Sequence, residues 1–412
     1  MEFKLPYGKK QINLEIPDKN LIPVLYKQKD ASNLNDETDI ISYALKNPIS
    51  SPPLADLASK KKNVCILVSD ITRPCPSYKF LPFIIEQLKR AGAGRIKIVF
   101  GLGIHRPHTE EEKLKLAGKT AAESCELIDS DQSRCRFAGN TSFGTPIEVF
   151  EDVLDSDFLI ATGNIEYHYF AGYSGGTKAL MLGVCSRKSV SANHSMMLED
   201  KAAAGRFFDN PVRQDIEEAG RLVPIDFIFN VILDDEKKII GAVSGKNNKA
   251  YLEGIKLYDS IYEIGIREHA DIVITSPGGY PKNINLYQAQ KALDNVKDIV
   301  KQGGKIILAA ECPEEFGEDV FEQWMADVRD YEKLYGKIRK QFVLGGHKAV
   351  AISKLMTKAD IYAYDDDSKG KACKAGFENI NDIQAFINSE IAKDKNIKIA
   401  VVPNGRFVKI LK

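Results

Sequence analysis

The sequence predicts an α/β fold of two α/β domains, each with a mostly parallel sheet. Short apolar runs such as VCILVS at 64–69 and IKIVFG at 96–101 alternate with helix-like stretches, which is typical of strand–helix–strand units. A second series of the same kind starts near residue 270, so the domains are expected at 1–268 and 269–412. Active sites of such proteins usually lie at the carboxyl ends of strands, and we expect an active-site cleft between the two domains.

The elements are expected in a simple order along the chain. Residues 1–20 should form a hairpin, because Phe3 and Leu5, then Ile12 and Leu14, alternate with polar residues around a YGKK turn. The first domain continues with strands at 64–69, 96–101 and 157–163 and a helix at 78–91. A helix over 246–269 leads into the second domain, with strands expected at 271–276, 305–310, 359–364 and 397–402 and helices at 285–302, 345–357 and 380–394.

The composition narrows the class of protein. The chain of 412 residues is 44% hydrophobic, and its 57 basic residues equal its 57 acidic ones, which argues against broad nucleic-acid or membrane-surface binding. No apolar run approaches the roughly 18 residues of a membrane span. The first residues lack the apolar core of a signal peptide, so we expect a cytoplasmic protein. Seven cysteines without a CxxC pair predict neither a disulfide framework nor a cysteine zinc site.

Polar residues and glycines gather just after the predicted strands. Asp70 and Arg73 lie in SDITRPCP at 69–76, where the arginine fork suits a carboxylate or a phosphate. The same pattern is given by an Asp–Arg pair that only closes the loop. His105 follows two glycines in GLGIHRPHTEEE at 101–112, a place from which a histidine can shuttle protons or hydrogen-bond for structure alone.

The segment GNIEYHYFAGYSGGTKALMLG at 163–183 is the richest in such residues. It contains His168, Gly175, Gly176 and Lys178. It is not a P-loop, because Thr177 precedes the lysine instead of following it. The glycines allow a ligand to approach the backbone closely and give the amine room to act as a nucleophile, although a purely structural glycine turn remains the alternative.

Two more clusters complete the set. His194, in SVSANH, ends a short predicted helix and is a candidate metal ligand, although a lone histidine there is commonly structural. The segment SPGGYPKNINLYQAQKAL at 276–293 places Gln288 and Lys291 three residues apart, on one helix face. That face either binds a ligand or is simply exposed and polar.

Taken together, these segments resemble the nickel-pincer lactate racemase family. The matching segments are DITRP, GIHRPHT, HYFAGYSGGTK, the NH of 193–194, NPVRQD at 210–215 and GGYPKNINLYQAQK. The resemblance runs from residue 60 to about residue 300. Spacings within the central block also agree, because ten residues separate His168 from Lys178 and sixteen separate Lys178 from His194.

The resemblance implies a racemase or epimerase that inverts the hydroxyl-bearing carbon of a 2-hydroxy acid, either lactate or a related short-chain or sugar acid. Its cofactor would be nickel held by pyridinium-3-thioamide-5-thiocarboxylic acid mononucleotide, the nickel-pincer nucleotide. Lys178 would carry this cofactor as a thioamide and His194 would be a nickel ligand, with Gly175 and Gly176 in the cofactor site. Separate enzymes that make the cofactor would be needed to load it.

The resemblance also implies roles for the remaining candidates. His105 and His168 would be the general acid/base pair, one taking the hydroxyl proton as the Cα hydride moves to the cofactor and the other protonating the opposite face. Residues of both domains would bind the substrate. These substrate-binding residues would be Arg73, Gln288 and Lys291, with Asp70 supporting them.

Two positions depart from the family pattern. Leu182 stands where a proline is expected before Gly183, and Thr177 stands where some members have a basic residue. Because both positions lie beside Lys178, the sequence does not select one 2-hydroxy acid. It does not predict the oligomeric state either. A nicotinamide-dependent 2-hydroxy acid dehydrogenase is the alternative, but the GxGxxG element that it needs after a strand is missing. A non-catalytic nickel-binding or anion-binding protein is a further alternative.

Overall fold

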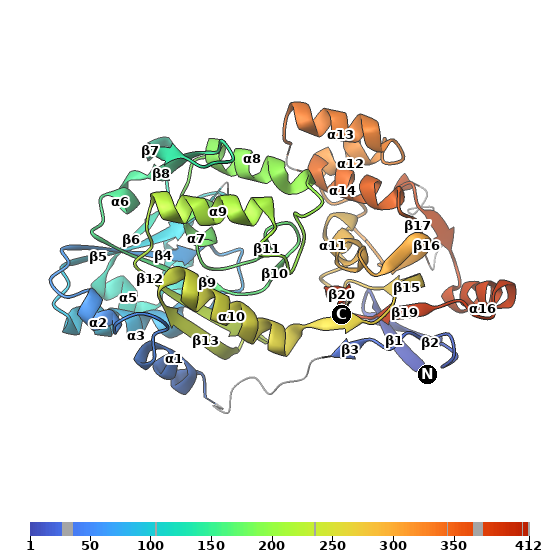
Figure 1. The fold of residues 1–412 in the computed structure, drawn as a ribbon, viewed down its shortest axis with the longest axis horizontal. Coiled ribbons are helices and arrows are strands. Elements are labelled where there is room, and N and C mark those ends of the chain that lie inside the picture. Colours follow the sequence, from blue (N-terminus) through green and yellow to red (C-terminus); the bar gives the residue numbers. More distant parts are fainter. Residues whose placement is uncertain are drawn as a thin grey trace. The chain divides into compact units, whose positions relative to one another are not determined.

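The computed structural model describes residues 1–26, 36–103, 105–234, 236–343, 345–365, 374–405 and 407–410. It divides the chain into two compact units. The central unit is Gln28–Ile261, and the terminal unit combines Met1–Lys27 with Tyr262–Lys412. Both are mixed α/β, with helices packed around strands (Figure 1), so the predicted fold class is confirmed.

The central unit is built on a six-stranded sheet in the order β13-β12-β9-β4-β5-β6. Its strands are β4 (Asn63–Ser69), β5 (Arg95–Gly101), β6 (Glu126–Asp129), β9 (Phe158–Asn164), β12 (Phe227–Leu233) and β13 (Ile239–Gly245). Neighbouring strands pair in parallel except β12 and β13, which are antiparallel. β4 and β9 are buried along almost their whole length, as expected of parallel strands with both faces covered.

Helices and short hairpins complete the central unit. The helices are α1 (Glu37–Lys46), α2 (Leu54–Leu57), α3 (Ser77–Arg90), α4 (Glu110–Ala117), α5 (Lys119–Ser124), α6 (Glu151–Leu154), α7 (Lys178–Met181), α8 (Arg187–Ser195), α9 (Pro211–Leu222) and α10 (Asn247–Tyr262). The hairpins pair β7 (Cys135–Asn140) with β8 (Pro146–Phe150) and β10 (Tyr167–His168) with β11 (Gly172–Tyr173). In α3, the buried Phe80, Ile84 and Leu88 recur every four residues and join the main core of this unit, so one apolar face fixes the helix on the sheet.

The strand order reverses beside β4. From β4 the chain adds β5 and β6 on one side and then places β9, β12 and β13 on the other. At such a point the loops that leave neighbouring strands diverge and open a crevice. The segments that follow β4, β5 and β9 carry Asp70, His105 and His168, so three of the predicted clusters leave the sheet at the same edge.

The terminal unit contains a five-stranded parallel sheet in the order β18-β17-β16-β15-β19. Its strands are β15 (Ala270–Thr275), β16 (Val300–Ala309), β17 (Ala359–Tyr364), β18 (Glu378–Ile380) and β19 (Ile399–Val402). Its helices are α11 (Leu286–Val296), α12 (Asp319–Met325), α13 (Tyr331–Lys340), α14 (Gly346–Met356) and α16 (Ile383–Lys393). A smaller sheet joins β3 (Leu25–Tyr26), β14 (Ile264–Ile266) and β20 (Val408–Ile410).

The predicted N-terminal hairpin is confirmed as β1 (Glu2–Tyr7) paired with β2 (Lys10–Glu15). It belongs to the terminal unit, however, whereas the predicted boundary near residue 268 assigned it to the first domain. The reason is burial of its apolar face: Leu5, Leu14 and Ile16 share a core cluster with Ile272 of the second sheet. A boundary drawn from chain order could not show this long-range contact.

Two predicted helices are too long. α10 ends at Tyr262, and Ile264–Ile266 forms β14, which pairs with β3 and β20. α11 ends at Val296, and Val300 already pairs with Ala270 in the sheet. In both cases, apolar residues at the start of a strand also fit a helical period. The other predicted strands and helices are confirmed, with ends that differ by a few residues.

Within the described ranges, no helix is long and apolar enough to cross a membrane. The six cysteines that the structure describes are free thiols. Cys373 lies outside the described residues.

Candidate active site

A polar cavity opens at the carboxyl ends of β4, β5 and β9. The last residues of these strands, Ser69, Gly101 and Asn164, contribute to its wall. Four of the residues predicted from the sequence also line it: Asp70, Arg73, Gly175 and Lys178. The cavity therefore lies where the reversal of strand order favours a ligand site.

The turn that precedes Lys178 depends on glycine. Gly175 and Gly176 have φ values of +84° and +58°, in the left-handed region that residues with a side chain rarely adopt. A Cβ atom at Gly176 would also lie 2.9 Å from the Tyr251 ring. The Gly176 N–H donates to Asn230 Oδ1 at 2.9 Å, which fixes the turn on β12. The chain can thus bring Lys178, the first residue of α7, to the cavity wall.

The amine of Lys178 is activated by its surroundings. Burial, aided by the positive charges of Arg73 and Arg213 and opposed by Glu166 and Asp70, lowers the pKa of this amine to about 7. At neutral pH a substantial fraction of the side chain is therefore uncharged. An uncharged amine is the nucleophilic form of lysine, so this position suits covalent attachment of a ligand.

This pKa predicts how Lys178 should respond to an acetylating reagent in the protein without a bound cofactor. Acetylation of Lys178 should rise as pH passes through about 7 and then level off, because the amine is fully deprotonated above its pKa. The reactivity of exposed lysines should still increase above pH 9, because an unperturbed lysine amine has a pKa of about 10.4. Peptide mass spectrometry after short exposures at a series of pH values measures both, and a Lys178 profile that rises only near pH 10 would contradict the assignment.

His168 lies on β10 and is half-buried. Burial lowers the pKa of its imidazole well below the ordinary value, and the charges of Lys178, Arg73, His194 and Arg213 add to this. The ring is therefore neutral at pH 7. Its Nδ1 accepts the Ala171 N–H at 3.2 Å, so in the neutral ring the proton resides on Nε2. His168 can present this Nε2–H to an oxygen of a bound ligand.

Phe170 links two of the predicted histidines. Its ring packs edge-on against His168 and His194, with 4.7 and 4.9 Å between ring centroids. His194 lies in the last turn of α8. Within the described part of the chain, no cluster of three or more His, Cys, Asp or Glu side chains could hold a metal ion. A metal at His194 would therefore need most of its ligands from a bound molecule.

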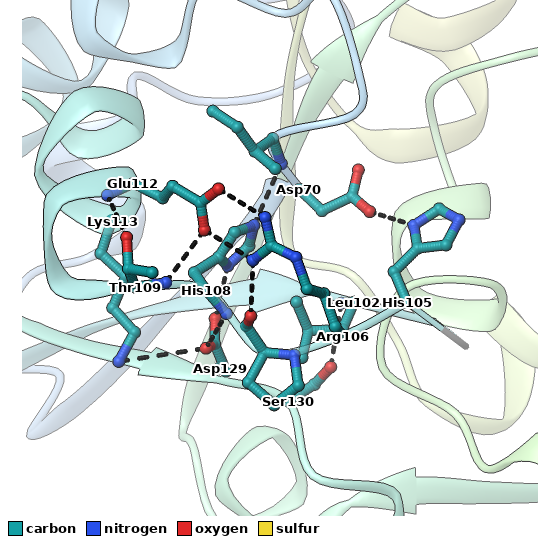
Figure 2. A network of polar contacts seen from close by, with 12 residues as sticks. Asp70, Leu102, His105, Arg106, His108, Thr109, Glu112, Lys113, Asp129 and Ser130 are labelled. Carbon is teal, nitrogen blue, oxygen red and sulfur yellow. Dashed lines mark hydrogen bonds and ion pairs between the residues drawn. The ribbon is translucent and has the colours of Figure 1, made fainter.

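His105 pairs with Asp70 (Figure 2). Its Nδ1 hydrogen-bonds to Asp70 Oδ2, and the Asp70 carboxylate is 3% exposed whereas the imidazole is 41% exposed. Burial would raise the pKa of Asp70, but hydrogen bonds from His105 and Thr72 and the charges of His105 and Arg73 hold it below its ordinary value. The carboxylate stays ionised at neutral pH and leaves Nε2 of His105 as the ring nitrogen that can accept a proton.

Arg73 adds a positive group beside this pair. Its Nε lies 3.8 Å from Asp70 Oδ1, and half of its side chain is exposed. The long contact leaves the rest of the guanidinium fork available for an anionic ligand. Arg73 can therefore both close the loop and bind a ligand, because its backbone N–H closes the turn with Asp70 and its side chain lines the cavity.

The His105 loop and the lysine segment are joined by hydrogen bonds. The Gly103 N–H donates to the Gly183 carbonyl at 2.9 Å, and Ser130 Oγ donates to the same carbonyl at 3.1 Å. Of the two departures from the family pattern, Leu182 lines the cavity and Thr177 is fully buried. The Thr177 hydroxyl contacts Glu217 and Asn247, so this residue stabilises the interior.

Arg213 lies in the segment NPVRQD and is fully buried behind the same turn. It donates to the carbonyls of Tyr173 and Gly175 at 3.2 and 3.5 Å and pairs with Glu217. Its guanidinium also lies 4.4 Å from the centre of the Tyr251 ring. Arg213 thus holds the carbonyls of the lysine-bearing turn. The sequence does not reveal which carbonyls this arginine contacts, so it predicts no role for it.

Replacing Arg213 with lysine should lower the free energy of unfolding by roughly 1–3 kcal/mol, because an ammonium cannot reach both carbonyls and the carboxylate and leaves a buried acceptor unsatisfied. Urea denaturation of the purified variant measures this. Arg221→Lys is the matched control, since Arg221 lies on the same helix with 61% of its side chain exposed. It should change stability by no more than about 0.5 kcal/mol. Equal effects of the two substitutions would contradict the role of Arg213.

Gln288 and Lys291 lie on α11 in the terminal unit. The Lys291 amine donates to Gln288 Oε1 at 2.9 Å, so the two side chains share one face of the helix as predicted. Gln288 is half-buried and Lys291 is exposed. Their expected contact with the substrate, together with Arg73 of the central unit, stays a prediction.

Comparisons with known proteins point to one family. The model of the lactate racemase N-terminal domain matches residues 7–205, and that of the lactate racemase C-terminal domain matches residues 266–410. The lactate racemase of Thermoanaerobacterium thermosaccharolyticum is 31% identical over 98% of this chain and 97% of its own length. That of Lactiplantibacillus plantarum is 34% identical over 79% of this chain and 78% of its own length.

Solved structures agree with these matches. The lactate racemase apoprotein of T. thermosaccharolyticum superposes with a TM-score of 0.89 and 30% identity, covering 100% of both chains. A Thermotoga maritima protein superposes with a TM-score of 0.62 at 18% identity, covering 94% of this chain and 100% of its own. The second likeness concerns the fold alone.

Proposed function

The chain belongs to the lactate racemase family, and from this premise we propose that it interconverts the enantiomers of lactate or of a closely related 2-hydroxy acid by hydride transfer. The observation that carries the proposal is one cavity at the sheet edge. Lys178, with its pKa lowered to about 7, lines this cavity together with Asp70, which pairs with His105. A nucleophilic lysine supports covalent cofactor attachment, and a carboxylate-held histidine supports proton transfer from a hydroxyl.

Two side chains suit the nickel-pincer cofactor that the family resemblance implies: Lys178, which lines the cavity, and His194, which packs on the same Phe170 ring as His168. Lys178 would hold the cofactor through its amine, and His194 would donate one imidazole nitrogen to nickel, which accepts mixed sulfur and nitrogen ligands. When bound, this cofactor would supply the centre that accepts and returns the Cα hydride.

The side chains of the protein would then bind the substrate and move its proton. Arg73 offers a guanidinium for the carboxylate of a 2-hydroxy acid. His105 Nε2 would take the hydroxyl proton while the Asp70 carboxylate stabilises the resulting imidazolium. His168 would be the second proton carrier, because the two enantiomers bear their hydroxyl on opposite sides of the carbon. To act as the acid it would first take a proton from solvent at Nδ1, so that donation from Nε2 leaves a neutral ring. Exchange with solvent would reset both rings between turnovers.

A chiral assay of the nickel-loaded protein tests this function. The protein should be purified from its native host or made together with the cofactor-producing enzymes, which we propose are needed for loading. Either enantiomer of lactate should be converted to the racemate without added nicotinamide, and longer 2-hydroxy acids tested in parallel should identify the preferred substrate. Loaded protein that converts none of them, or that requires a nicotinamide, would contradict the proposal.

Lys291→Ala tests the proposed substrate role of the terminal unit. If the Lys291 ammonium contacts the substrate carboxylate, its loss should raise KM by on the order of tenfold or more, the effect of a charged hydrogen bond. The cofactor content should stay unchanged. Lys395→Ala, an exposed lysine in the same unit, is the control. An unchanged KM for Lys291→Ala would assign this lysine to the exposed polar face of α11.

A further inference from the structure

His108, the second histidine of the segment HRPH, contacts the loop that carries Asp70 (Figure 2). Its Nε2 accepts the Ile71 backbone N–H at 3.0 Å. Its Nδ1 lies 2.7 Å from Asp129 Oδ1, while Asp129 Oδ2 accepts the backbone N–H of His108 at 2.9 Å. Only 1% of the His108 side chain is exposed, so these bonds replace contacts with water.

The partners of His108 define one protonation state of its ring. Nε2 accepts a hydrogen bond from an N–H group, so it carries no proton, and Nδ1 must then donate to the Asp129 carboxylate. The edge-on contact with Phe100, with 5.4 Å between ring centroids, fixes the plane of the imidazole. His108 is therefore a rigid spacer between Asp129 and Ile71.

The bond to Ile71 acts on the peptide unit that joins Asp70 to Ile71. The N–H of this unit donates to His108, and its carbonyl, that of Asp70, accepts the Arg73 N–H at 3.1 Å. Both ends of one peptide plane are thus held. Because a peptide unit is rigid, holding both of its ends limits rotation about the Asp70 Cα–C bond and so restricts the direction of the Asp70 side chain. That side chain is the one that bonds His105 Nδ1.

The first turn of α4 is stabilised without the contacts that the His108 ring makes. Thr109 and Glu112 form a capping box, and Arg106 makes a two-pronged ion pair with Glu112 at 2.7 and 2.8 Å. Those bonds stabilise the first turn of the helix without the imidazole of His108. The ring of His108 instead contacts Ile71 and Asp129, which lie 37 and 21 residues away in sequence.

We propose that His108 is a positioning residue for proton transfer: through the Asp70–Ile71 peptide it holds the Asp70 carboxylate against His105 and keeps the proton of neutral His105 on Nδ1. This inference rests on the proposed function, because that function gives His105 its task. It adds a relay that runs from Asp129 through His108 and Asp70 to His105. Loss of the relay lets the carboxylate turn away, and the His105 ring then populates both tautomers.

Two substitutions at His108 separate the positioning role from simple packing. In His108→Gln the amide oxygen reaches the place of Nε2 and can still accept the Ile71 N–H. In His108→Asn the shorter amide reaches only the place of Nδ1, so it can bond Asp129 but not Ile71. Both remove the imidazole from its contact with Phe100 and so perturb packing alike. Arg106→Ala is a control in the same loop, since Arg106 contacts Pro107 and Glu112 outside the relay.

The first readout needs no cofactor. Nitrogen-15 NMR of the histidine-labelled protein reports the tautomer of His105, and the Ile71 amide shift reports its hydrogen bond. The wild type, His108→Gln and Arg106→Ala should keep the Nδ1–H tautomer, whereas His108→Asn should show a mixture and a shifted Ile71 amide. If His108→Asn fails to fold, Asp129→Asn is the substitute, because it removes the carboxylate that orients the His108 ring and should give the same mixture.

The second readout is turnover of the loaded enzyme. His108→Asn should lower kcat on the order of 10- to 100-fold, the effect of misplacing a reacting group by about an ångström, with little change in KM. His108→Gln should stay within about threefold of the wild type, a change of under roughly 1 kcal/mol. Equal losses in the Gln and Asn variants, or an unchanged His105 tautomer in His108→Asn, would overturn the proposal. The NMR comparison tests the effect of His108 on the His105 tautomer even if the wild type racemises no 2-hydroxy acid. Failure of the proposed function can therefore be distinguished from failure of the positioning role of His108.

Discussion

Lys178→Arg is expected to abolish racemisation while the protein stays folded. Arginine keeps a positive charge, but its guanidinium stays protonated under all conditions of assay and is not a nucleophile. It therefore cannot form the covalent bond through which Lys178 would hold the cofactor. The cofactor carries the chemistry of hydride transfer, so the variant should show no measurable turnover and no covalent adduct.

The control for this substitution is Lys188→Arg on α8, where 69% of the lysine side chain is exposed. It should retain wild-type turnover and adduct. Circular dichroism and thermal unfolding establish that both variants are folded. Undiminished turnover of Lys178→Arg would remove Lys178 from the proposed role, whatever its position in the cavity.

Alanine substitution of His105 or His168 should reduce racemisation by on the order of a hundredfold or more in both directions, as is typical for loss of a general acid or base. The rates in both directions should fall by the same factor. Two enantiomers have equal free energy, so the equilibrium constant is one and ties the forward rate to the reverse rate. Initial rates measured from each pure enantiomer test this. The nickel and cofactor content should stay at the wild-type level.

His269→Ala is the control for the histidine variants, because His269 is an exposed residue of the terminal unit.

The pH profile gives a second check on His105. The Asp70 carboxylate has a pKa below its ordinary value, so it stays ionised until well into the acidic range, and its support of His105 should be lost only as pH falls through that lowered pKa. Asp70→Asn should mimic this loss at neutral pH. A His105→Ala variant with wild-type rates in both directions would exclude His105 from proton transfer.

Much of the fold could be predicted because each parallel strand is a short apolar run with a turn after it. β17, at Ala359–Tyr364, lies where the run ADIYAY predicts it. The two helices that the sequence predicts too long share a physical cause: pairing in a sheet overrides the helical period of the residues at their ends. Ile264–Ile266 is extended because β3 and β20 pair with it, and neither partner is near it in sequence.

The site was predictable where function depends on local sequence. Gly175 and Gly176 must be glycine to reach positive φ, so the turn beside Lys178 is visible in the sequence itself. The pairing of Asp70 with His105 was not visible, because 35 residues separate them and only the neighbouring positions of β4 and β5 bring them together. Arg213 was missed for the same reason, since its role lies in carbonyls about 40 residues away.

Mass analysis of the Lys178 peptide tests the central claim most directly. The loaded protein, from its native host or made with the cofactor-producing enzymes, should be digested and mapped, and its nickel content should be measured on the same sample. The account predicts an adduct of several hundred daltons on Lys178, close to one nickel per modified chain, and loss of both in Lys178→Arg. A preparation that racemises lactate while its Lys178 peptide is entirely unmodified would contradict the account.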